Sequence, residues 1–69
     1  MKNRLNARKI KNEIDVKIDQ YTAGELGQLQ ESLTTMEGYL RKNRDHEAEE
    51  YARLALLTVQ ERIEELDME

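Results

Sequence analysis

Two runs of apolar residues at helical spacing limit what this chain can fold into. The first run consists of Leu26, Leu29, Leu33, Met36 and Leu40, at intervals of three and four residues. This spacing places the side chains on one face of a helix, as in the a and d positions of a coiled coil. Thr22 and Glu25 precede the run with the spacing of a capping box. The pattern predicts a helix over residues 22–43.

The second run lies closer to the C-terminus and consists of Ala52, Leu56, Val59, Ile63 and Leu66. Asp45 stands before it as a good N-cap, so we expect a second helix over residues 45–67. Because only a few residues separate the two helices, they should return antiparallel as an αα-hairpin.

The segment before the first helix, residues 12–21, fits two structures. Ile14, Val16 and Ile18 alternate with charged residues, which is typical of a half-buried β-strand. Ile10, Ile14, Ile18 and Tyr21 also fall at spacings of four, four and three, which fits a helix. The β-branched residues favour a short N-terminal strand, and an extra helix remains the alternative.

Composition and length bear on the oligomeric state. A chain of 69 residues without Cys forms at most one small domain, residues 1–69, with a limited core and no disulfides. Tyr51, Leu54 and Leu57 extend the apolar surface of the second helix beyond the apolar run. A helix that is apolar on more than one side is buried on more than one side. We therefore predict a mainly α protein that dimerises into a helical bundle through these three residues.

Charge divides the chain into a basic start and an acidic remainder. The net charge is −4, but residues 1–11 contain no acidic residue. This basic arm carries Lys2, Arg4, Arg8, Lys9 and Lys11. Such a segment can bind a nucleic-acid phosphate backbone, although it contains no aromatic residue for base stacking.

Acidic residues gather at one pole of the predicted hairpin. This acidic pole consists of Glu25, Glu61, Glu64, Glu65 and Asp67. It is a candidate surface for binding a partner protein.

The residues that usually carry catalysis or bind metals are scarce. The chain has one His (His46), one Ser (Ser32) and no Cys, whereas a nucleophile needs a positioned base and a zinc site needs several ligands. We expect no catalytic site, no cofactor and no metal. No apolar run approaches the length of a membrane span, so a cytoplasmic protein without membrane contact is expected.

These features predict a small non-enzymatic protein-interaction module. It would bind and modulate a larger protein, in the manner of an inhibitor, and its size and composition are typical of bacterial or phage-encoded regulators. Two alternatives remain: a small nucleic-acid-binding regulator that uses the basic arm, and a structural subunit of an assembly.

Overall fold

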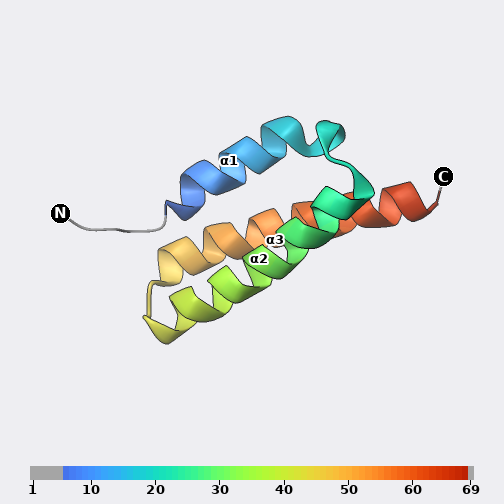
Figure 1. Ribbon diagram of the computed structural model, residues 1–69. Coiled ribbons are helices and arrows are strands. Elements are labelled where there is room, and N and C mark those ends of the chain that lie inside the picture. The colour runs from blue at the N-terminus through green and yellow to red at the C-terminus, as the bar shows by residue number, and fades with distance from the viewer. Residues whose placement is uncertain (1–5, 69) are drawn as a thin grey trace.

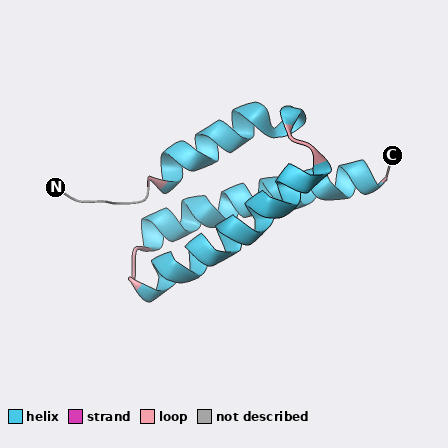
Figure 2. Cartoon of the chain, viewed as in Figure 1, coloured by secondary structure: helices cyan, strands magenta, loops and turns pink. Residues whose placement is uncertain are grey.

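The computed structural model describes residues 6–68, which are almost entirely helical (Figures 1 and 2). The elements in chain order are α1 (Ala7–Lys17), the short 3₁₀-helix η1 (Ile18–Gln20), α2 (Ala23–Lys42) and α3 (His46–Asp67). The mainly α class predicted from the sequence is confirmed. The predicted N-terminal strand is wrong, because residues 12–17 belong to α1 and no strand occurs within residues 6–68.

The start of α1 is fixed by Asn6, whose side chain accepts a hydrogen bond from the Lys9 amide at 3.0 Å. Ile14 is 2% exposed, whereas Val16 is 77% exposed. A strand would place both side chains on one face, but a helix separates them. The helical spacing prevails because one face of a helix can pack Ile10, Ile14 and Ile18 together against the core.

The predicted caps of α2 and α3 are both present. The Thr22 hydroxyl accepts a hydrogen bond from the Glu25 amide, and the Glu25 carboxylate accepts one from the Thr22 amide, which completes the capping box. Asp45 Oδ1 accepts a hydrogen bond from the Ala48 amide at 3.2 Å. These bonds satisfy amides that the first turn of a helix leaves unpaired.

The connection between α2 and α3 contains one residue in the left-handed region. Asn43 ends α2, and its side-chain amide donates a hydrogen bond to the Tyr39 carbonyl oxygen at 2.8 Å. Arg44 follows with a φ of 59°. The turn leads directly to the N-cap of α3, so that α3 runs back beside α2 (Figure 1).

α3 packs against both of the other helices. Its alanines 52 and 55 are completely buried. Ala52 forms a cluster with Ala7 of α1 and Leu40 of α2. Ala55 belongs to a second cluster, in which the other buried members are Ile14, Leu26, Leu33 and Val59. Because alanine side chains are short, α1 and α2 can both approach the α3 backbone closely, and the core is shared among all three helices.

Candidate interaction surface

The three residues predicted to form a dimer interface lie in two different environments. Tyr51 is half-buried and packs against the cluster of Ala7, Leu40 and Ala52 within its own chain. Leu54 and Leu57 are 37% and 48% exposed. They therefore lie on the outward side of α3, away from the other two helices.

Four glutamates continue the line of these leucines along α3. Together they form the outer stripe, which consists of Glu47, Glu50, Leu54, Leu57, Glu61 and Glu64, all exposed. Successive members are separated by three and four residues alternately, so they share one face of the helix. The stripe has an apolar centre and two acidic ends.

Sequence reasoning found four of these six residues but assigned them to two separate surfaces. It missed Glu47 and Glu50. The signal that could have found them is the alternating three-and-four spacing, which extends from the leucine pair toward both ends of α3.

The other members of the predicted acidic pole are partly engaged in local interactions. Glu25 closes the capping box of α2. Glu65 Oε1 accepts a hydrogen bond from Arg62 Nη1 at 3.1 Å. Asp67, the last residue of α3, is exposed. Of the acidic residues of the pole, Glu61 and Glu64 continue the three-and-four spacing of the exposed leucines.

Part of the predicted basic arm belongs to the folded helix α1. Lys2 and Arg4 lie outside the described residues. Arg8 and Lys9 are exposed on α1, and Lys11 forms an ion pair with Asp15 at 2.6 Å. Arg8, Lys9 and Lys17 line a shallow hollow around Val16, together with Asn6, Asn12 and Glu13. The outward side of α1 therefore carries exposed cations.

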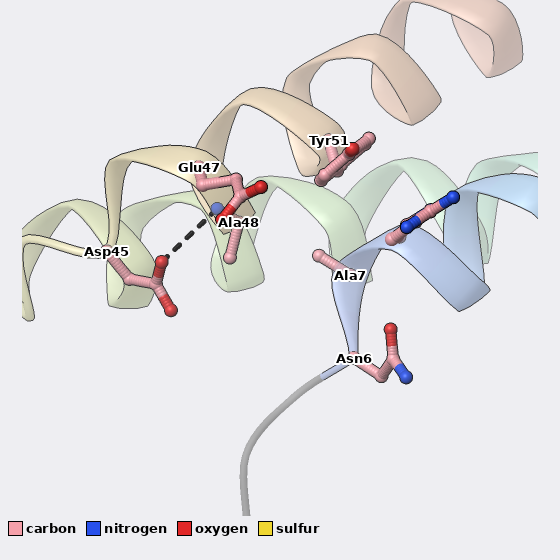
Figure 3. Close-up of a pocket in the computed structure, with 7 residues that line it drawn as sticks. Asn6, Ala7, Asp45, Glu47, Ala48 and Tyr51 are labelled. Atoms are coloured by element: carbon pink, nitrogen blue, oxygen red, sulfur yellow. Dashed lines mark hydrogen bonds between the residues drawn. The ribbon is translucent and has the colours of Figure 1, made fainter.

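A second hollow of about 340 Å³ lies where the first turns of α1 and α3 meet (Figure 3). Tyr51 and Ala48 line it from α3, and Ala7 and Arg8 line it from α1. The Asp45 carboxylate, also in its wall, is occupied in capping α3. Glu47 belongs both to this hollow and to the outer stripe, so the two surfaces adjoin.

One glutamate is buried among basic side chains between α2 and α3. Glu49 is 6% exposed, and its Oε2 accepts a hydrogen bond from Arg41 Nε at 2.9 Å. Arg53 lies 3.9 Å from the same carboxylate, and His46 lies 3.8 Å from it. The hydrogen bond from Arg41 lowers the pKa of Glu49 below its ordinary value of 4.5; burial opposes this shift, and the nearby positive charges support it. The arrangement joins the two helices and is structural.

The lowered pKa of Glu49 predicts a stability change in acid. The ionised form is favoured in the folded state, so its contribution is complete above pH 4.5 and is lost as the pH falls through the lowered pKa. Replacing Glu49→Gln should lower the unfolding temperature at neutral pH, and this difference from the parent chain should shrink below pH 4.5. Thermal unfolding followed by circular dichroism across this range measures the effect.

The variant Arg41→Gln provides the matched comparison, because it removes the donor instead of the acceptor. Like Glu49→Gln, it should remove most of the pH-dependent stabilisation of the folded chain. The double variant should be only slightly less stable than either single variant. A difference between Glu49→Gln and the parent chain that stays constant from neutral to acid pH would contradict this account.

Within residues 6–68, no group of three or more His, Cys, Asp and Glu side chains could hold a metal ion. None of the helices in this part of the chain is long and apolar enough to cross a membrane. No protein-family model, curated protein or solved structure matches the sequence. The outer stripe combines exposed leucines and exposed glutamates on one face of α3.

Proposed function

We propose that this chain is a small non-enzymatic interaction module that binds and modulates a larger protein. The observation that carries the proposal is the pair of exposed leucines at the centre of the outer stripe. The chain places its other long aliphatic residues of α2 and α3 in the shared core, whereas Leu54 and Leu57 remain at the surface.

Covering these two leucines would favour binding. Complete burial of a leucine side chain contributes about 2 kcal/mol relative to full exposure. Because less than half of each residue is exposed, covering the exposed part would contribute about 1 kcal/mol of binding free energy for each leucine. The flanking glutamates add charge, which restricts the choice of partner more than it adds affinity.

The homodimer predicted from the sequence would use the same leucines, and it stays a prediction. Light scattering on the purified chain tests it directly. A mass of two chains that falls to one in the double variant Leu54→Lys, Leu57→Lys would assign the leucines to self-association.

Affinity capture tests the proposed binding of a larger protein. The tagged chain, incubated with extract of the cells that naturally express it, should retain a specific protein, and the double variant Leu54→Lys, Leu57→Lys should lose it. Since both positions are exposed, the variant should keep its helical circular dichroism. Val16→Lys is the matched control, because Val16 is an exposed apolar residue on a different helix, and it should retain the partner. Equal capture by all three chains, or by none, would refute the proposal.

A nucleic-acid-binding regulator is the second candidate, and the exposed cations on α1 favour it. Deleting residues 1–11 would be a poor test, because Ala7 is buried and Ile10 packs against the core. The double variant Arg8→Ser, Lys9→Ser removes two exposed charges and keeps these contacts. Fluorescence anisotropy with a labelled DNA or RNA oligonucleotide at low salt should then show weaker binding that also depends less on salt. Absence of binding by the parent chain would exclude this function.

A further inference from the structure

The charge pattern of the outer stripe specifies what kind of surface can cover it. Leu54 and Leu57 lie at the centre, with Glu50 and Glu47 on one side and Glu61 and Glu64 on the other. Building on the proposed function, we propose that the outer stripe binds a partner helix that presents two apolar residues flanked at both ends by basic residues.

The spacing of the stripe fits a helix as the bound element. Intervals of three and four residues are those of the a and d positions through which two helices pack side by side. From residue 47 to residue 64 the stripe is about 26 Å long at 1.5 Å per residue. A partner helix of about five turns could therefore contact its whole length.

A second copy of the chain fits this face poorly. In an antiparallel pair with Leu54 of one copy opposite Leu57 of the other, the same register places Glu50 opposite Glu61 and Glu47 opposite Glu64. In a parallel pair each glutamate faces its own equivalent. Both arrangements bring like charges together at each end of the contact, which is unfavourable between packed helices.

The chain itself neutralises little of this charge. Arg53 lies 3.3 Å from Glu50, and it is also shared with Glu37 and Glu49. Arg62 pairs with Glu65, which is not one of the six stripe residues but lies beside Leu54 and Glu61 on the helix. Within residues 6–68, none of the ion pairs at 4.0 Å or less joins a Lys or Arg to the carboxylates of Glu47, Glu61 or Glu64. Basic side chains of a partner can therefore pair with these carboxylates.

The matching partner pattern follows from these positions. It consists of two basic residues, two apolar residues and two basic residues, separated by intervals of three and four residues alternately. Because the pattern reads the same in both directions, the stripe does not favour one orientation of the partner helix. The partner's apolar pair would cover the leucines, and its basic residues would lie beside the glutamates.

A synthetic helical peptide is the probe for this inference. It carries lysine at the four positions facing the glutamates and leucine at the two positions facing Leu54 and Leu57, with alanine and glutamine elsewhere. Fluorescence anisotropy should show saturable binding to the full chain, and the affinity should fall as salt is added. A second peptide with glutamate in place of each lysine should not bind. Equal binding of the two peptides, or binding of neither, would overturn the proposal.

Variants of the chain show whether the peptide binds at the stripe. Leu54→Ser with Leu57→Ser should weaken binding of the lysine peptide by about tenfold or more. Glu61→Gln with Glu64→Gln should weaken it and reduce its salt dependence. Val16→Ser is the control on α1 and should bind as the parent chain does. Unchanged affinity in both stripe variants would place the peptide elsewhere and overturn the inference.

The outcomes separate this inference from the proposed function. If the lysine peptide fails to bind while affinity capture still loses its protein with Leu54→Lys, Leu57→Lys, the module binds a partner of different chemistry. If light scattering shows a dimer that the leucine variants dissociate, the stripe is an interface between copies, and the basic partner helix is excluded.

Discussion

Replacing Leu26→Ala should remove a large part of the free energy of unfolding of this chain. Leu26 is completely buried and belongs to the cluster that joins α2 to α1 and α3. Shortening a buried leucine to alanine costs about 2–5 kcal/mol, because apolar contact is lost and a cavity remains. Small domains of this length have a total free energy of unfolding of roughly 3–10 kcal/mol. Urea denaturation should therefore show a midpoint far below that of the parent chain, and the variant should be largely unfolded if the parent stability is at the low end of this range.

The control for this prediction makes the same chemical change at an exposed position. Leu57→Ala should change the free energy of unfolding by only about 0.5 kcal/mol, because the side chain is 48% exposed and leaves no cavity. If Leu57→Ala destabilised the chain as much as Leu26→Ala, Leu57 would have to be buried in solution, as it would be in the homodimer predicted from the sequence.

The parts of the fold that could be predicted are those determined by residues close together in the sequence. The apolar run from Leu26 to Leu40 places its residues in the core. Thr22 and Asp45 cap α2 and α3 because a capping hydrogen bond spans only three residues. These features needed no knowledge of the rest of the chain.

The packing of α3 was harder to predict because it depends on α1. Sequence reasoning used Ala52 as part of an apolar run but did not identify Ala55 as a core residue. Ala55 is completely buried because Ile14 of α1 packs in the same cluster. The strand that was favoured for residues 12–21 would not have placed Ile14 in this cluster, whereas the alternative helix does.

The candidate site was predicted in pieces. Leu54 and Leu57 were recognised as apolar residues outside the main run, and Glu61 and Glu64 were recognised as part of an acidic group. Their common face follows from the three-and-four spacing along α3, and α1 and α2 pack against other sides of this helix. The side of α3 that neither helix covers contains both the leucine pair and the glutamate pair.

The assignment of α1 itself can be tested by two substitutions that a strand and a helix treat differently. If residues 12–17 formed a half-buried strand, Ile14 and Val16 would lie on the same face, and shortening either residue would be costly. In the helix, Ile14 is 2% exposed and Val16 is 77% exposed. Ile14→Ala should therefore cost about 2–5 kcal/mol, and Val16→Ala should not destabilise the chain.

Val16→Ala should even stabilise the chain slightly, by about 0.5 kcal/mol, because alanine is a better helix former than valine. Ile14→Ala should also weaken the packing of α1 on the core, because Ile14 joins α1 to the cluster that contains Ala55 and Val59. Amide hydrogen exchange in α1 should then become faster than in α2, because α1 separates from the core before the rest unfolds. Equal destabilisation by the two substitutions would be incompatible with α1 as a helix. If Ile14→Ala alone destabilises the chain but amide hydrogen exchange is equally fast in all three helices, the helices unfold together.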